Sequence, residues 1–183
     1  EAAAAHGATR ILVPAGDAAE ARHRAGEGLA VVPIDGVEAL LAEALAPAKA
    51  RAHPDRAMDE ARRVFSSGWR GYRWPTVRET LSRLAGTLPE GRLDLRVEAL
   101  TRLAAAHRHL GDPAGSLDLL REAEAIAGSE EGLRAVPDAP LTYLFQHMAM
   151  THRQLCRFEE ATESAARSVA IAREARLRGE LIK

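Results

Sequence analysis

The side chains in this chain that are best suited to bind a metal ion are its histidines. The sequence contains seven of them, and two close pairs fall in stretches with a helical pattern. His107 and His109 are two positions apart, which places them on different sides of a helix. His147 and His152 are five apart, whereas paired metal ligands on a helix are separated by three or four positions. Because no cysteine or carboxylate completes either pair, we expect no metal site and no cofactor.

Candidate nucleophiles also lack the partners that they would need. Cys156 is the one cysteine; it falls in a predicted turn, and nothing in the sequence identifies a base that would activate it. The serines at 66–67 and Ser164 have no nucleophile context, and no glycine-rich phosphate loop is present. The carboxylates at 130–131 and 159–160 are typical of loop and helix-start charges. We therefore expect no catalytic residue in this chain.

Aromatic residues alternate with arginines between Ser66 and Pro75. The segment contains Trp69, Tyr72 and Trp74, and aromatic rings beside arginines can bind single-stranded nucleic acid. A turn in which the rings lock two helices together is the alternative. The net charge of −1 at pH 7 provides no wider basic surface. We therefore favour the turn and expect no nucleic-acid partner.

Composition disfavours several classes of protein. A single cysteine excludes a disulfide framework and fits a reducing compartment. No apolar run approaches the roughly 18–20 residues of a transmembrane helix, and no secretory signal is visible. We therefore expect a cytoplasmic protein with no membrane partner. The chain opens with EAAAAHGATR, without Met and in what reads as a helix, so we also expect it to be part of a longer protein.

Residues 1–48 form a first segment in which strand and helix patterns alternate. Short apolar runs at Arg10–Pro14 and Leu29–Ile34 are rich in Ile and Val and predict buried strands. Helical composition follows each run, over 17–24 and 37–45. This order predicts a parallel strand pair with a right-handed crossover. Because two strands do not form a stable sheet alone, the segment should need partner strands or the helices that follow.

The first segment resembles the end of the peptidase domain of Lon-type serine proteases. The resemblance covers residues 2–45 and lies in the order and spacing of Ala2–Gly7, Ile11–Pro14, Asp17–Ala21, Gly28–Leu29, Val31–Ile34 and Glu38–Leu45. In that family a lysine activates the catalytic serine, and both positions would lie upstream of residue 1. Lys49 lies past the end of the family's domain, so the role does not pass to it. The resemblance implies a non-catalytic C-terminal part of a Lon-like protease, with the rest of its parent chain as a partner. A generic α/β piece unrelated to Lon is the alternative.

Residues 49–183 form a second segment that reads as helical, which makes the predicted fold class mainly α. Helical periodicity covers 54–67 and 75–88. The stronger signal is an internal repeat, in which 98–127 aligns with 143–172 at an offset of 45 residues. Each copy reads as a helix, a short turn and a helix, and residues 128–140 form a loop between the copies. The aligned pairs are Leu103 with Met148, Ala104 with Ala149, His107 with His152, Leu110 with Leu155, and Ser116 with Ala161.

The repeat resembles the tetratricopeptide repeat, although its period exceeds the roughly 34 residues usual for that family. The resemblance implies a solenoid of stacked helical hairpins, with residues 54–88 as a degenerate third hairpin or a cap. The first helix of each hairpin would line a concave groove that binds a peptide or partner helix. An unrelated helical bundle, with these positions as solvated surface, is the alternative. In the tetratricopeptide register the groove-facing residues are Glu98, Thr101, Ala105, Arg108 and His109 in the first copy and Tyr143, Gln146, Met150, Arg153 and Gln154 in the second.

These observations leave several functions open. In the first, the helical repeats bind a regulatory or substrate protein for a Lon-like protease. The alternative is a stand-alone tetratricopeptide-type scaffold or adaptor with no protease activity. A third, weaker possibility is an enzyme whose active site forms only with another chain. The first two share a protein or peptide partner in the repeat groove.

Overall fold

The computed structural model describes residues 10–14, 18–24, 30–34, 47–71 and 74–181. Side chains are described for 19–24, 49–66 and 74–176. The chain divides into two compact units, Glu1–Ala46 and Pro47–Lys183, whereas the sequence suggested a division after residue 48. The predicted helix over 37–45 lies outside the described residues.

The first unit contains a parallel pair of strands joined through a helix. Strand β1 spans Arg10–Pro14, helix α1 spans Ala18–Arg24, and strand β2 spans Ala30–Ile34. Arg10 lies opposite Ala30 and Pro14 lies opposite Ile34, so the two strands are in register over their full length. Parallel strands cannot be joined by a tight turn, which explains why α1 lies between them in the chain.

The described residues of the second unit are mainly helical, and the mainly α class expected from the sequence is confirmed. None of the described helices is long and apolar enough to span a membrane. The helices are α3 (Pro47–Ala52), α4 (Pro54–Gly71), α5 (Trp74–Ala85), α6 (Leu93–His109), α7 (Pro113–Ala127), α8 (Gly132–Ala135), α9 (Asp138–Gln154) and α10 (Phe158–Leu181).

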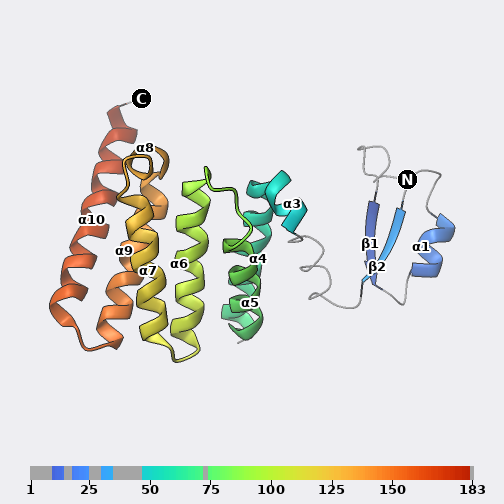
Figure 1. Ribbon diagram of the computed structural model, residues 1–183, viewed down its shortest axis with the longest axis horizontal. Coiled ribbons are helices and arrows are strands. Elements are labelled where there is room, and N and C mark those ends of the chain that lie inside the picture. The colour runs from blue at the N-terminus through green and yellow to red at the C-terminus, as the bar shows by residue number, and fades with distance from the viewer. Residues whose placement is uncertain (1–9, 15–17, 25–29, 35–46, 72–73, 182–183) are drawn as a thin grey trace. The chain divides into compact units, whose positions relative to one another are not determined.

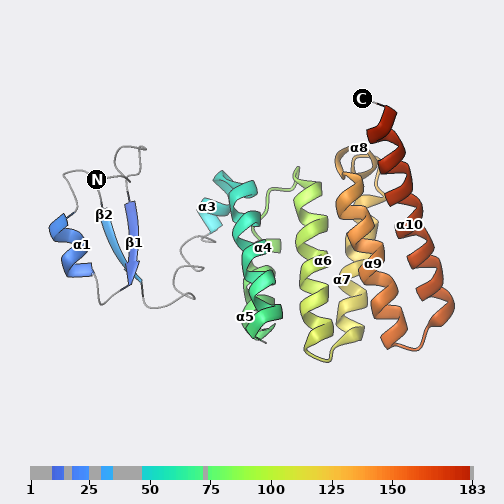
Figure 2. The same ribbon diagram turned by 180° about the vertical axis from the view of Figure 1, so that it is seen from behind.

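Six of these helices pack as three successive hairpins. Helix α4 packs on α5, α6 on α7, and α9 on α10. The hairpins are joined by contacts of α6 with α4 and α5, and of α9 with α6 and α7. Figures 1 and 2 show the helices of this unit standing side by side in a row. The first helices of the three hairpins, α4, α6 and α9, are thereby brought next to one another.

The second and third hairpins have the same design. Helix α9 begins and ends 45 residues after α6, at 138 against 93 and at 154 against 109. Each helix is followed by a residue in the left-handed region, Gly111 with φ 83° and Cys156 with φ 58°. The amide of Asp112 donates to the carbonyl of His107, and 45 residues later the amide of Arg157 makes the equivalent bond. The two hairpins therefore turn in the same way, and α8 lies in the connection between them.

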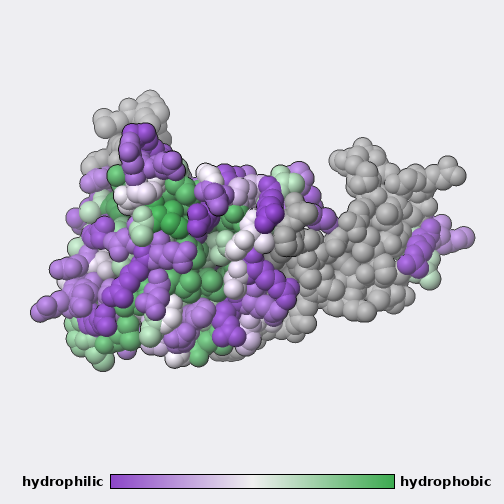
Figure 3. Space-filling model, viewed as in Figure 1, coloured by the Kyte–Doolittle hydropathy of each residue, from purple (hydrophilic) through white to green (hydrophobic). Residues whose placement is uncertain are grey.

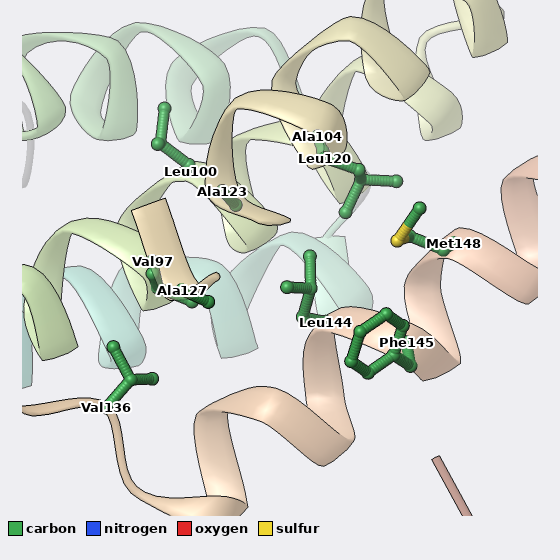
Figure 4. Packing of buried hydrophobic residues seen from close by; sticks show 10 residues of the cluster. All are labelled: Val97, Leu100, Ala104, Leu120, Ala123, Ala127, Val136, Leu144, Phe145 and Met148. Atoms are coloured by element: carbon green, nitrogen blue, oxygen red, sulfur yellow. The ribbon is translucent and has the colours of Figure 1, made fainter. Parts of the chain in front are cut away.

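The central core lies between α6, α7 and α9. Leu120 of α7 and Leu144 of α9 are fully buried there, and alanines of α6 and α7 allow the helix backbones to approach closely. Figure 4 shows these side chains converging from the three helices. On the visible face in Figure 3, hydrophobic residues are interrupted by hydrophilic ones. The ten residues of the core cluster are Val97, Leu100, Ala104, Leu120, Ala123, Ala127, Val136, Leu144, Phe145 and Met148.

Trp74 joins the first hairpin to the second. Its buried ring meets Phe65 of α4 edge-to-face, with ring centroids 5.7 Å apart. It stacks on His109 at the end of α6, with centroids 4.1 Å apart. Such aromatic pairs stabilise a contact beyond the area that they bury. The ring of Trp74 thus packs between helices, as expected, but residues 66–71 continue α4 and do not form the expected turn. The side chains of Trp69 and Tyr72 lie outside those described.

Candidate functional site

The three first helices of the hairpins line a common pocket with a volume of about 500 Å³. Its wall combines four charged side chains with apolar groups from α6 and from the first turn of α9. Pro137 is the N-cap of α9 and makes no side-chain capping bond, so the start of that helix faces the pocket uncapped by a side chain. We call this hollow the shared pocket; its lining residues are Arg62, Asp94, Leu95, Glu98, Arg102, Pro137, Ala139, Pro140 and Tyr143.

A carboxylate that accepts hydrogen bonds from two arginines forms one side of the shared pocket. Glu98 is only 8% exposed. It accepts hydrogen bonds from Arg62 Nε at 2.7 Å and from Arg102 Nε at 2.9 Å. Burial raises the pKa of Glu98, but the hydrogen bonds and positive charges of the two arginines outweigh this and lower the pKa overall. Glu98 is therefore ionised at neutral pH and ties α4 to α6.

Arg102 also lies against two aromatic rings. The carbon of its guanidinium is 5.1 Å from the ring centre of Phe65 and 5.2 Å from that of Tyr143. Both distances fall within the range of cation–π attraction. Burial raises the pKa of Tyr143, so its phenol stays protonated at neutral pH and can donate a hydrogen bond. The wall at Tyr143 thus offers an aromatic face and a polar tip.

Arg108 lies further along α6 and is only 6% exposed. Its Nη2 donates to Nδ1 of His147 over 3.2 Å, and its Nε has no hydrogen-bond partner among the residues that the structure describes. Burial, followed by the charges of Arg108 and Arg102, lowers the pKa of His147 to about 3. His147 is therefore neutral at pH 7, which allows its Nδ1 to accept. Burial also lowers the pKa of Arg108 from its ordinary value.

The structure separates the predicted groove residues into three groups. Glu98 and Tyr143 line the shared pocket. Gln146, Arg153 and Gln154 are exposed on α9, and Met150 is half-buried there. The others point into the packing of the helices: Thr101, Ala105 and Arg108 are buried, and His109 stacks on Trp74.

The expectation for Thr101 is therefore wrong, as is that for Ala105. Both residues are fully buried. The hydroxyl of Thr101 donates to the carbonyl of Val97 at 2.7 Å, which satisfies it inside the helix packing. Neither side chain can contact a ligand, because neither has any exposed surface.

Sequence reasoning missed several polar residues of this site. Arg102 could have been found, because Glu98 and Arg102 are four positions apart and neighbours of that spacing pair on a helix. Arg62 is 36 positions from Glu98 in the chain, so no short-range spacing in the sequence predicts their contact. His147 was considered only as a metal ligand, and its bond with Arg108 depends on how α9 packs on α6.

A second hollow, with a volume of about 470 Å³, lies along α5 near His107. Apart from His107, every residue that lines it belongs to α5. Its Glu79 and Arg83 already pair with each other on the exposed surface. Few groups converge there from different helices, so the shared pocket is the better candidate for a binding site.

Among the described residues, no group of three or more histidines, cysteines and carboxylates is close enough to hold a metal ion.

Comparison of the chain with protein-family models, with curated proteins and with solved structures gives no match. The geometry of the shared pocket therefore carries the functional proposal.

Proposed function

We propose that the helical unit binds a segment of another protein in the shared pocket. The observation that carries this proposal is the convergence of three hairpins on one hollow. Leu95, Pro137 and Pro140 supply apolar wall, while Arg102 and Tyr143 supply polar groups that can fix an orientation. A mainly apolar hollow with a few convergent polar groups is typical of a ligand site.

An extended occupant fits this site better than a compact small molecule. The exposed side chains of Gln146 and Gln154 and the half-buried Met150 continue along α9 beyond the pocket. They provide further amide and thioether contacts for a chain that runs along the helix. A peptide or a partner helix could therefore be anchored in the pocket and continue along the exposed side chains of α9.

The stacked hairpins support the further proposal of a tetratricopeptide-like solenoid. Its first helices α4, α6 and α9 pack in sequence, and two hairpins repeat at 45 residues with the same turn. Solenoids of this kind present the first helices of successive repeats as a continuous binding surface. The shared pocket lies between helices of that set.

Selection from a random dodecapeptide library displayed on phage, with the full chain as bait, tests the proposal. We expect soluble copies of the selected peptides to bind, as measured by fluorescence anisotropy. Ala139→Trp should weaken binding about tenfold or more, because it places a large ring at the lining of the pocket. The matched control is Ala114→Trp, an exposed alanine at the second position of α7 that does not line the pocket. Failure to select any peptide, or equal binding by both variants, would overturn the proposal.

A second candidate function is that this unit serves a Lon-like serine protease as its C-terminal part. The parallel order of β1, α1 and β2 supports it, because the resemblance requires such a strand–helix–strand segment there. Intact-mass analysis of the natural protein, together with labelling by a serine-directed fluorophosphonate probe, tests this idea. A mass well above 19.7 kDa with a labelled serine would support it. If the natural protein has about this mass and takes no label, the protease proposal fails and only the scaffold function remains.

A further inference from the structure

Arg108 is a buried cation to which the described residues supply no counter-charge. Among the described residues it makes no ion pair, and its Nε has no hydrogen-bond partner. Within the part of the chain that the structure describes, Arg108 bonds to His147, which is neutral at pH 7. Burying an unpaired charge is unfavourable in general, because water no longer solvates it. An anion supplied from outside would remove much of that cost.

The surroundings of Arg108 favour an anion. Arg153 lies close enough to act on Arg108 electrostatically, and it is exposed with no ion pair among the described residues. Arg102 and Arg108 both act on the phenol of Tyr143, which lines the shared pocket. Arg108 is therefore within electrostatic range of the pocket wall. Tyr143 offers a phenolic hydrogen that an incoming anion can accept.

Glu98, the buried carboxylate on the same helix, does not neutralise Arg108. Glu98 is already held by Arg62 and Arg102. Arg108 and Arg153 are left as positive charges on adjoining parts of α6 and α9. A basic segment would be repelled there, and an uncharged one would leave the Arg108 guanidinium unsatisfied.

We propose that Arg108 binds a carboxylate from an Asp or Glu of the partner segment, so that the α6–α9 surface adjoining the shared pocket selects acidic peptides. This inference rests on the proposed function of the helical unit. Arg108 keeps 6% of its surface exposed, which is where the carboxylate meets it. The guanidinium fork is suited to planar anions such as carboxylates.

The peptides selected on the full chain provide the test. We expect them to be enriched in Asp and Glu over the unselected library. Replacing one acidic position by its amide should weaken binding to the wild-type chain about tenfold, and binding should weaken further as salt is raised. Arg108→Met should cause a similar loss for the parent peptide and almost none for the amide peptide.

Two controls separate this effect from unfolding or general charge loss. The circular dichroism melt of Arg108→Met should occur at or above the wild-type temperature, because the variant removes an unpaired buried charge. Arg121→Met removes an exposed arginine of α7 that does not line the pocket, and it should leave peptide binding unchanged.

The outcomes distinguish this inference from the proposed function. If peptides bind and Ala139→Trp weakens them, but they are not acidic or their amide forms bind equally well, the role of Arg108 is refuted and the peptide site stands. If no peptide is selected, both fail. Should Arg108→Met not fold, the amide peptides measured on the wild-type chain still decide the matter.

Discussion

Replacing Glu98 by glutamine should destabilise the helical unit by about 2 kcal/mol. The substitution keeps the shape of the side chain and removes its charge, so that Arg62 and Arg102 lose their common carboxylate. Losing one partner of a fully buried ion pair costs roughly 3–5 kcal/mol. The value here is smaller because the side chain of Arg62 is 41% exposed and water can replace part of the lost interaction.

Urea unfolding of the full chain, followed by circular dichroism at 222 nm, measures this loss. A decrease of about 2 kcal/mol corresponds to a fall in melting temperature of about 8 °C for a unit of this size. The control is Glu79→Gln, which removes the same charge from an exposed pair with Arg83 on α5. That variant should change the free energy of unfolding by no more than about 0.5 kcal/mol.

The pH dependence of the Glu98→Gln effect provides a sharper check. The two arginines lower the pKa of Glu98 in the folded chain, so its ionisation stabilises the fold above the unfolded-state pKa near 4.5. That contribution is lost as pH falls through the lower, folded-state pKa. The wild-type and variant curves should therefore converge in acid. A cost equal to that of Glu79→Gln at pH 7, or a gap that does not narrow in acid, would refute the reasoning.

Three further predictions concern the left-handed turn residues, Gly132 of α8, and His147. Cys156→Gly should stabilise the chain by about 1 kcal/mol and Gly111→Ala should destabilise it by a similar amount, since both positions have positive φ and glycine adopts it without strain. Urea unfolding of the two variants checks both signs, and a lower free energy of unfolding in Cys156→Gly would contradict the prediction. Gly132→Ala should cost about 2 kcal/mol or more, because a Cβ there would collide with a backbone carbonyl oxygen, whereas Gly91→Ala meets nothing within 4 Å and should be nearly neutral. Burial lowers the pKa of His147 to about 3 from 6.5, so the unfolded chain binds a proton that the folded chain does not. Because of this group, the free energy of unfolding of the wild type should fall by about 2 kcal/mol between pH 7 and pH 5. His147→Gln should remove that part of the pH dependence, and an unchanged pH dependence would argue against the low pKa.

The helical hairpins follow from signals that are local in the sequence. The periodic apolar residues of α6 and α9 mark these helices. Between α6 and α7, Gly111 permits the left-handed turn, the side chain of Asp112 accepts from the amide of Gly115, and Pro113 begins the next helix. Such signals act over a few residues and can be read without knowing the rest of the fold. They explain why the two hairpins of the repeat could be placed.

The site was harder to predict because its contacts join distant parts of the chain. Thr101 was expected to face a groove because the tetratricopeptide register assigns its position in the first helix to the groove. In the structure, Val97, Thr101 and Arg108 form one buried stripe of α6. How far such a stripe is covered depends on the angle at which the neighbouring helices cross it. The bond from Arg62 to Glu98 likewise exists only because α4 packs on α6.

The stacking order of the hairpins also bears on how the unit folds. The main contacts of each helix are with helices close to it in the chain, such as α5 with α6 and α9 with α10. Short loops close quickly, so a chain built from such neighbours should fold fast and can begin at any hairpin. The amides of α6 should exchange with solvent most slowly, since this helix is covered on both sides. Those of α10 should exchange sooner, because opening this end breaks contacts on one side only.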